Sequence, residues 1–594
     1  MKQFFLASVL LLCMNACSYG QEIRNNVSVG SPFSFNTNSK AAMQKVNIAL
    51  AAIENFYVDT VNSNQLAENA ITGLLEKLDP HSAYLSANEV KDADEPLQGN
   101  FDGIGVMFNM MTDTLYVIQV ISGGPSEKVG ILPGDQILSV NDTVIAGVKM
   151  KDYDVMRRLK GPKGTVVNVK VLRKGYPKLL DFKIIRDKIP VYSLTSSYMI
   201  DKKTGYIKLD RFAKTTYDEF KEAVRKLQAQ GMENLILDLQ DNGGGYLESA
   251  IELANEFLKP GSLIVYTEGV HQKRQDARSD NSGSFKNGKL VVLVNEYSAS
   301  ASEILSGAIQ DWDRGVIVGR RTFGKGLVQR PVPLPDGSLI RLTTARYYTP
   351  TGRSIQKPYT KGDAEAYAKE LIDRYNRGEM LSEDSIHFPD SLKYNTLIKN
   401  RVVYGGGGIM PDFFVPVDTT SAINIAGATP LFRDLYSRSI LYKYVRALIG
   451  DNREKYQKQY PTFDSFRKNF TVTDDMVNDL MAFYEKEKAD ESKGKAAQPE
   501  VLKNNPTGKA TQLQPVEKSN TQDQSKEQQQ KDLEKSKILI VQQIKIQIAR
   551  EIYSDNEYYQ LINPLIDTYN KGVEIISNDS QYNQLLNGVM RKKN

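Results

Sequence analysis

The spacing of apolar and polar residues changes from one region of the chain to the next. Phe4–Cys13 is an apolar run after Lys2, too short to cross a bilayer as a permanent helix. From Ala41 to Leu78 apolar residues recur at helical spacing, which predicts a helical domain over residues 40–95. Residues 96–188 hold short apolar runs separated by Gly- and Pro-containing turns, which predicts a β-rich module.

Residues 189–418 alternate apolar strand patterns with amphipathic helical patterns. Asn234–Leu239 and Lys289–Asn295 are rich in Val, Ile and Leu, and each is followed by a turn and a helical pattern. This alternation predicts an α/β layer. Residues 358–401 are polar with helical patches and read as an insertion, after which Gly405–Val415 is again strand-like.

The C-terminal third is mostly helical in pattern. Residues 419–484 predict a helical extension, and residues 536–594 a C-terminal helical region suited to dimerisation or to partner docking. Residues 485–535 are rich in Lys, Glu, Gln and Asn and nearly lack aromatic and β-branched residues, which predicts a disordered linker. The fold class expected is therefore multidomain α/β with helical N- and C-terminal regions.

The amino-acid composition limits which residue types can carry out catalysis or bind a metal. The 594 residues include 76 Lys and Arg against 71 Asp and Glu, a net charge of +5, with 41% hydrophobic and 25% charged residues. These values exclude a polytopic membrane protein and a wholly disordered chain, and they give no indication of a nucleic-acid partner. The only cysteines are Cys13 and Cys17, and there are three histidines. We therefore expect no metal and no cofactor, and catalysis by Ser, Lys, Asp or Glu.

The N-terminus predicts export. Residues 1–17 have the charge and apolar run of a signal peptide, and Met14-Asn15-Ala16-Cys17 resembles a bacterial lipobox. That reading makes Cys17 lipidated and residues 18–39 an Asn/Ser-rich tether, with the protein periplasmic or associated with the outer membrane. The alternative is simple cleavage near Gly20, which also places the protein outside the cytoplasm.

Ser298-Ala299-Ser300-Ala301-Ser302-Glu303 follows a predicted strand and opens a helix with one apolar face. One of its serines therefore lies where free backbone N–H groups and the positive end of the helix dipole converge. A nucleophile there would gain donors for an oxyanion. The alternative reading is a helix N-cap, for which Ser is a favoured residue.

Two glycine-rich segments accompany it. Gly319 to Lys325 nearly matches a phosphate-binding loop, but Gly326 replaces the required Ser or Thr, so we do not expect a nucleotide. A Lys between two glycines can be buried, and a pKa lowered from about 10.4 to about 7 would make Lys325 a general base for a serine. Asp241-Asn242-Gly243-Gly244-Gly245 could aim N–H groups at a ligand oxygen or form a plain turn.

In these motifs the chain resembles the C-terminal processing (tail-specific) peptidases, which are exported serine proteases with a Ser/Lys dyad. The resemblance covers most of residues 40–357 and returns at Gly405–Val415. The motifs that carry it are Leu78-Asp79-Pro80-His81-Ser82, Gly103-Ile104-Gly105-Val106, Gly130 to Asp135, Asp241 to Gly245, Ser298 to Glu303, Thr322 to Gly326 with Gln329, and Gly408 to Asp412. The resemblance implies a ClpP/crotonase-like α/β protease core with an inserted domain.

The resemblance also assigns roles. In the family the nucleophile and the lysine are 25 residues apart, the separation of Ser300 and Lys325. It further implies that Gln329 orients the lysine and that Ala301 and Gly244 donate to the oxyanion. Asp311 matches a further position with a less settled role, and Gln240 stands where the family usually has Arg.

Residues 96–188 resemble a PDZ domain, which implies that Gly103, Ile104, Gly105 and Val106 bind a free chain terminus. Ile104, Val106 and Phe108 would then line a pocket for an apolar last residue; the alternative is a domain that serves only as a lid. The function expected is an exported, lipid-anchored serine endopeptidase acting on proteins or peptides with free, apolar C-termini. The alternative from another class is a catalytically silent PDZ scaffold that binds protein tails.

Overall fold

The computed structural model describes residues 37–111, 113–121, 123–173, 175–418, 428–450, 452–496 and 526–588. The predictions for the signal peptide, Cys17 and the tether up to residue 36 lie outside these residues. The chain divides into two compact units, residues 1–75 and 76–594. The first contains α2 (Thr37–Phe56) and all but the last residue of α3 (Ser63–Glu76), as the helical spacing predicts. The rest of the predicted helical domain, residues 76–95, belongs to the second unit and includes the strand β1 (Ala83–Leu85). Within the described residues, the helices lack the length and apolar character needed to cross a membrane.

The second unit includes the β-rich module. Its strands and helices are β2 (Asn100–Gly103), β3 (Val106–Met111), β4 (Thr114–Val120), α5 (Pro125–Lys128), β5 (Gln136–Val140), β6 (Thr143–Val144), α6 (Asp152–Leu159), β7 (Val166–Leu172), β8 (Leu180–Ile185) and β9 (Asp187–Pro190). Strands β3, β4, β5, β7 and β8 form an antiparallel sheet in that order. Along β7, Val167, Val169 and Val171 are buried while their neighbours are exposed, the alternation of a sheet with one face on a core. Because β2 pairs with β9, the chain enters and leaves this module at adjacent points.

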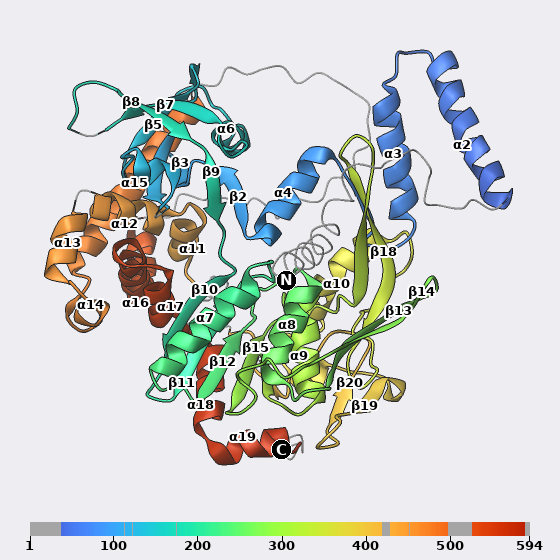
Figure 1. The fold of residues 1–594 in the computed structure, drawn as a ribbon. Helices are drawn as coiled ribbons and strands as arrows, with labels where there is room; N and C mark the ends of the chain where they lie inside the picture. Colours follow the sequence, from blue (N-terminus) through green and yellow to red (C-terminus); the bar gives the residue numbers. More distant parts are fainter. Residues whose placement is uncertain are drawn as a thin grey trace, which may run out of the picture. The chain divides into compact units, whose positions relative to one another are not determined.

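The α/β layer predicted over residues 189–418 is built on a six-stranded sheet (Figure 1). Its order is β10 (Leu194–Met199), β11 (Thr204–Leu209), β12 (Asn234–Asp238), β15 (Leu290–Val294), β16 (Val316–Gly319) and β21 (Phe413–Phe414). The neighbouring strands are parallel except for β10, which runs antiparallel to β11. Strands β12 and β15 agree with the two predicted strands to within one residue at each end.

Helices cover both faces of this sheet. Leu237 and Val292 pack toward α7 (Thr216–Ala229), α8 (Leu247–Phe257) and α9 (Ala301–Asp311). Ile236 and Leu293 alternate with them and pack on the other face against α18 (Asp567–Ser577) and α19 (Asp579–Leu586). The last part of the predicted C-terminal helical region, α18 and α19, is therefore the second covering layer of the core, preceded by α17 (Asp555–Ile562) and η3 (Asn563–Leu565), whereas its first residues, 536–552, belong to a helix of the helical extension.

A second sheet and the insertion flank the core. The sheet contains β1 (Ala83–Leu85), β18 (Leu339–Tyr348), β13 (Leu263–Gly269) and β14 (Gln272–Arg278), with β17 (Leu327–Pro333) on β18; the helix α4 (Ala87–Gln98) follows β1. The insertion contains α10 (Ala364–Asn376), η1 (Glu383–Ser385), η2 (Asp390–Leu392) and the start of the β19 (Lys393–Asn395) and β20 (Val402–Tyr404) pair. Of the strand-like segment Gly405–Val415, only Phe413–Phe414 is in a strand, because glycines 405–408 form a loop.

The helical extension has its own core. It consists of α11 (Pro430–Ser437), α12 (Ile440–Gly450), α13 (Arg453–Gln459), α14 (Phe463–Asn469), α15 (Asp474–Ala496) and α16 (Lys526–Ile552). Ile540, Ile544 and Ile548 of α16 are fully buried in it. The disorder predicted for residues 485–535 is therefore wrong at both ends, where α15 and α16 continue into the segment; residues 497–525 lie outside the described part.

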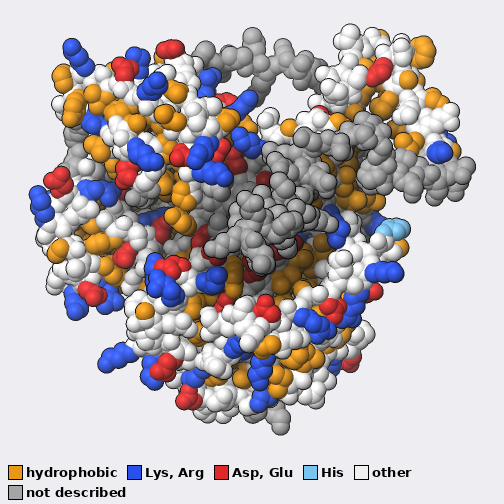
Figure 2. Space-filling model, in the orientation of Figure 1, with side chains coloured by type: hydrophobic (Ala, Val, Ile, Leu, Met, Phe, Trp, Pro, Cys, Tyr) orange, Lys and Arg blue, Asp and Glu red, His pale blue; other side chains and the backbone are white. Residues whose placement is uncertain are grey.

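The surface carries both signs of charge. Figure 2 shows Lys and Arg side chains interspersed with Asp and Glu side chains over the visible face. This mixture matches the small net charge of +5. It leaves binding specificity to local sites rather than to a single-sign field.

Candidate active site

The three serines at the turn between β15 and α9 differ in their surroundings. The Ser298 hydroxyl donates to the Leu239 carbonyl at 2.8 Å, and the Ser302 hydroxyl donates to the Asn242 carbonyl at 2.9 Å. Ser300 is 8% exposed and has φ of 56° and ψ of −110°. Such a backbone is strained for a residue other than glycine, and strain of this kind gathers at functional sites. Ser300 is also the residue from which α9 starts, where backbone N–H groups converge.

Glu303 connects the serine turn to the lysine loop. Its fully buried carboxylate accepts, through Oε2, the backbone N–H groups of Ser300 and of Lys325, each at 2.8 Å. Oε1 accepts the Gly324 N–H at 2.6 Å and the Thr322 hydroxyl at 2.5 Å. Burial raises the pKa of Glu303, and these four donors oppose the rise. Glu303 is not among the residues predicted to have a role, although Ser-x-x-Glu before an apolar run indicates a capping box.

Lys325 lies in the loop between β16 and β17 with its side chain half-buried. Burial lowers the pKa of its ammonium group, the charge of Arg341 lowers it further, and the Glu303 carboxylate opposes both. A lysine in this setting is closer to the neutral amine that can act as a general base. Gln329, predicted to orient this lysine, instead donates its side-chain amide to the Leu327 carbonyl at 3.3 Å.

The glycine loop approaches the serine turn as closely as a backbone can. A Cβ on Gly244, which has φ of +99°, would lie 2.8 Å from the Ser300 Cβ and 3.0 Å from the Ala301 nitrogen. Only glycine fits this position. The two predicted oxyanion donors, Ala301 and Gly244, are therefore adjacent to Ser300. In this structure, however, the Gly244 N–H donates to Asn242 Oδ1 at 2.9 Å, so it is not free for a substrate oxygen.

Family models match four parts of the chain. Peptidase family S41 matches residues 203–366, a PDZ domain matches residues 103–184, the N-terminal domain of the activating protease CtpB matches residues 13–89, and a family of unknown function matches residues 431–505. The first two ranges fall on the core with the Ser300 and Lys325 loops and on the β-rich module.

Two relatives extend this likeness over most of their own length. The carboxy-terminal-processing protease of Bartonella bacilliformis is 38% identical over 307 residues, which are 50% of this chain and 69% of the relative. The carboxy-terminal processing protease CtpA of Bacillus subtilis is 32% identical over 374 residues, 62% of this chain and 78% of the relative. The chain belongs to peptidase family S41. It is a serine-type peptidase of the carboxy-terminal processing group with a PDZ domain.

A solved structure also resembles the chain. The photosystem II D1 C-terminal processing protease has 30% sequence identity and covers 52% of this chain and 89% of its own. The TM-score of this match is 0.30.

Asp311, the predicted accessory residue, lies at the opposite end of α9 from Ser300. Its carboxylate pairs with Arg353 at 2.8 Å, and both side chains are fully buried. The other carboxylate oxygen accepts the Thr351 N–H at 3.0 Å and the Thr351 hydroxyl at 2.8 Å. Asp311 is the last of the eleven residues of α9, which rises about 1.5 Å per residue, so the structure does not bring Asp311 to Ser300.

The predicted tail-binding residues lie at the junction of two strands of the PDZ domain. Gly103 ends β2, Val106 begins β3, and Gly105 between them has φ of +77°. Ile104 is 3% exposed and belongs to the core of the domain. It therefore does not line an open pocket, whereas Val106 and Phe108 are only partly buried at the edge of that core.

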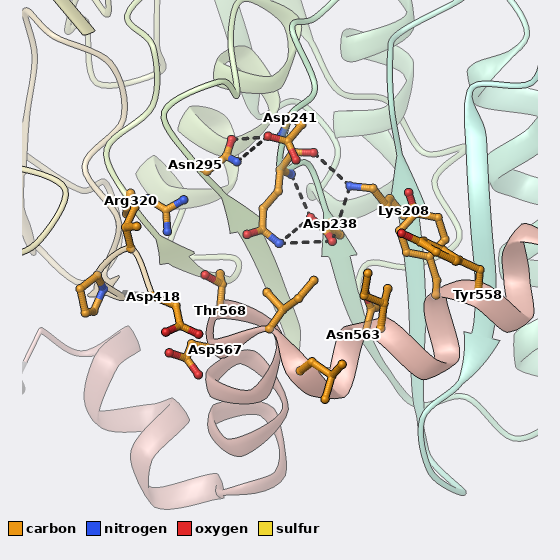
Figure 3. Close-up of a pocket in the computed structure, with 17 residues that line it drawn as sticks. Lys208, Asp238, Asp241, Asn295, Arg320, Asp418, Tyr558, Asn563, Asp567 and Thr568 are labelled. Carbon is orange, nitrogen blue, oxygen red and sulfur yellow. Dashed lines mark hydrogen bonds and ion pairs between the residues drawn. The ribbon is translucent and has the colours of Figure 1, made fainter. Parts of the chain in front are cut away.

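A pocket of about 510 Å³ lies behind the glycine loop (Figure 3). Asp241 in its wall donates its N–H to Asn295 Oδ1 at 3.0 Å and accepts from Asn295 Nδ2 at 2.8 Å. Lys208 Nζ donates to the Gln240 carbonyl at 3.0 Å and lies 3.8 Å from Asp238. Gln240, at the position where the resemblance leads us to expect Arg, donates its side-chain amide to Asp238 Oδ1 at 3.2 Å, and Lys208 is a buried cation beside the same carboxylate. Helices α17 and α18 form the other wall, so the C-terminal region reaches the back of the glycine loop.

Proposed function

We propose that the chain is an exported serine endopeptidase that cleaves proteins near their C-termini, with Ser300 as nucleophile and Lys325 as general base. The observation that carries this proposal is the Glu303 carboxylate, one oxygen of which binds the backbone N–H groups of both residues. The strained backbone of Ser300 and the burial that favours a neutral Lys325 support it further.

In the proposed reaction Lys325 carries the proton in every step. Neutral Lys325 accepts the Ser300 hydroxyl proton as Oγ attacks the scissile carbonyl carbon, and the amine then leaves with that proton. The Ala301 N–H at the start of α9 binds the oxyanion. Gly244 becomes the second donor when its N–H turns away from Asn242, a movement that its glycine backbone permits. Water activated by Lys325 then hydrolyses the acyl ester.

A serine-reactive fluorophosphonate tests the nucleophile directly. We expect labelling of the intact chain, full loss of labelling in Ser300→Ala, and retention in Ser302→Ala, because the Ser302 hydroxyl is held by the Asn242 carbonyl. Thermal unfolding of each variant controls for folding. Labelling of Ser300→Ala at the rate of the intact chain would contradict the assignment.

We also propose that the PDZ domain reads the free carboxylate of the substrate through the segment Gly103–Val106. The match of residues 103–184 to the PDZ family supports this. Backbone donors to a carboxylate contribute about 1.5–3 kcal/mol each, so amidating the C-terminus of a cleavable peptide should slow its cleavage about tenfold or more. The measurement is a matched pair of peptides with an apolar last residue, one free and one amidated.

The loop can be altered with a matched control. A Cβ on Gly105 would lie 3.0 Å from Ile189, whereas one on Gly164, which also has positive φ, would meet nothing within 4 Å. Gly105→Ala should therefore reduce the preference for the free peptide, and Gly164→Ala should preserve it. Equal cleavage of both peptides by the intact enzyme would show that the domain does not read the carboxylate.

We propose that export leaves the chain anchored by lipid at Cys17, outside the cytoplasm in the periplasm or at the outer membrane. Met14-Asn15-Ala16-Cys17 after an apolar run supports this. In cells fed labelled palmitate, Cys17→Ser should lose the label and leave the membrane fraction. Cys13→Ser should keep both, and label retained in Cys17→Ser would refute lipidation at this residue.

A further inference from the structure

The inserted segment 358–401 packs directly on the loop that carries Lys325. The Arg374 guanidinium of α10 is 1% exposed and donates to the Thr322 carbonyl at 3.1 Å and the Arg321 carbonyl at 2.7 Å. Arg321 in turn pairs with Glu379 of the insertion at 2.5 Å. Glu303 holds the lysine loop from one side, and α10 therefore holds it from another.

Tyr367, on the same helix, forms an aromatic wall beside this loop. Its ring is 8% exposed and meets the rings of Phe323 and His81 edge-on, with centroids 6.1 and 5.1 Å apart. The Lys357 ammonium lies 4.1 Å from the ring centroids of both Phe323 and Tyr367 and pairs with Glu370 of α10 at 2.9 Å. Cation–π contact and the ion pair together fix this wall.

The Tyr367 hydroxyl lies between the side chains of His81 and Gln356. It is 2.8 Å from His81 Nε2 and 3.5 Å from Gln356 Nε2. The other amide atom of Gln356, Oε1, accepts the N–H of Gly326 at 2.8 Å. One hydroxyl thus connects the His81 segment to the residue that follows the lysine.

His81 lies close enough to Lys325 for the charge of the lysine to influence its pKa, and it stays neutral. Burial lowers the pKa of His81 to about 4, the positive charge of Lys325 contributes next, Arg341 and Lys357 act in the same direction, and Asp79 opposes them. A neutral imidazole can share a hydrogen bond with the Tyr367 hydroxyl over the whole working pH range.

We propose that Tyr367 is a positioning residue for the reaction: it closes the side of the active site next to Lys325, keeps water away from the amine, and holds the lysine loop in place. The proposal rests on the proposed Ser300/Lys325 dyad. It assigns a role to a segment beyond the S41 family match, which ends at residue 366.

Tyr367 should affect the rate because Lys325 can act as a base only when water is kept away from its amine, which favours the neutral form. Burial is the largest cause of the lowered pKa of Lys325. Around it, Glu303 from α9 favours the ammonium form, Arg341 from β18 favours the neutral amine, and neutral His81 contributes little charge. Lys357, the remaining cation near His81, is engaged with Glu370. Opening the wall at Tyr367 would let water reach the amine and move its pKa back toward that of an ordinary lysine.

The experiment measures the cleavage of unfolded casein by the full chain between pH 5 and 10. Tyr367→Ala should move the acid limb of the rate profile upward by about one pH unit, with an activity about fivefold lower at pH 7 that recovers near pH 9. Tyr367→Phe keeps the ring and loses the hydroxyl. The acid limb of its rate profile should therefore lie between those of the intact chain and of Tyr367→Ala. Tyr375→Phe, on the same helix but 54% exposed, should match the intact chain.

Two results would overturn the proposal: an unshifted acid limb in Tyr367→Ala, or a loss of rate that is equal at every pH, as a purely structural role would give. If Tyr367→Ala does not fold, an unshifted limb in Tyr367→Phe overturns it instead. Lys325→Ala on the same substrate separates the two hypotheses. If Lys325→Ala is inactive and the acid limb of Tyr367→Ala is unshifted, only the positioning role is refuted. If Lys325→Ala is fully active, the dyad is refuted and the positioning role with it.

Discussion

Lys325→Ala should abolish cleavage of protein substrates at neutral pH while the chain stays folded. Removing a general base costs about 10²–10⁴ in rate by itself, and more where nucleophile and base act as a unit. We therefore expect Ser300→Ala and Lys325→Ala each to lower kcat by about 10⁴ or more. Because burial disfavours the Lys325 ammonium, its loss should not lower the melting temperature.

The measurement is casein cleavage together with thermal unfolding, with Lys361→Ala, a change at an exposed lysine, as the control. The sign of the pH dependence follows from the same mechanism. A neutral lysine is required, so activity is lost as the pH falls through the pKa of Lys325 and is retained at mildly alkaline pH. An activity optimum below about pH 5 would contradict a lysine base.

Sequence patterns predicted those parts of the fold that depend on residues close together in the chain. Strands β12 and β15 are apolar runs between turn residues, and the face of α9 repeats every three to four residues, so both were identified within a residue or two. The expected serine turn, glycine loop and lysine loop do meet. Their meeting was implied by a family resemblance, not by periodicity, because nothing local in the sequence brings residues 244, 300 and 325 together.

The parts that were missed depend on tertiary contacts. Residues 485–496 and 526–535 lack the apolar content of an independent core, but they extend helices whose other residues pack in one, such as Ile540 and Ile544. Lys, Glu and Gln are good helix formers, so such extensions cost little. Likewise, the polar insertion 358–401 gave no indication of function, since the roles of Tyr367 and Arg374 come from partners far away in sequence.

Glu303 belongs to a motif that the sequence analysis identified, but it was given no role there. Its spacing from Ser300 is that of a capping box, and the bond from the Ser300 N–H to its carboxylate is part of such a cap. The bonds to Gly324 and Lys325 add a second task that only the folded chain reveals, since those residues come from another loop.

Asp311→Asn should strongly destabilise the core while leaving the chemistry of the folded enzyme nearly unchanged. The substitution leaves the fully buried Arg353 guanidinium without its counter-ion, and breaking a buried pair from one side costs about 3–5 kcal/mol. For a domain of this size each kcal/mol lowers the melting temperature by about 2–4 °C, so we expect a fall of about 10 °C or more. Because Asp311 lies at the far end of α9, kcat per folded molecule should stay within about threefold of the intact enzyme.

Two further variants define what this result means. Asp218→Asn on α7 removes an 84% exposed carboxylate and should leave the melting temperature unchanged. The double variant Asp311→Leu/Arg353→Met removes both buried charges and should lose less stability than the two single substitutions added together, because neither charge is left alone. If Asp311→Asn instead kept its melting temperature and lost turnover, the carboxylate would belong to the catalytic machinery and the structural account of the ion pair would be wrong.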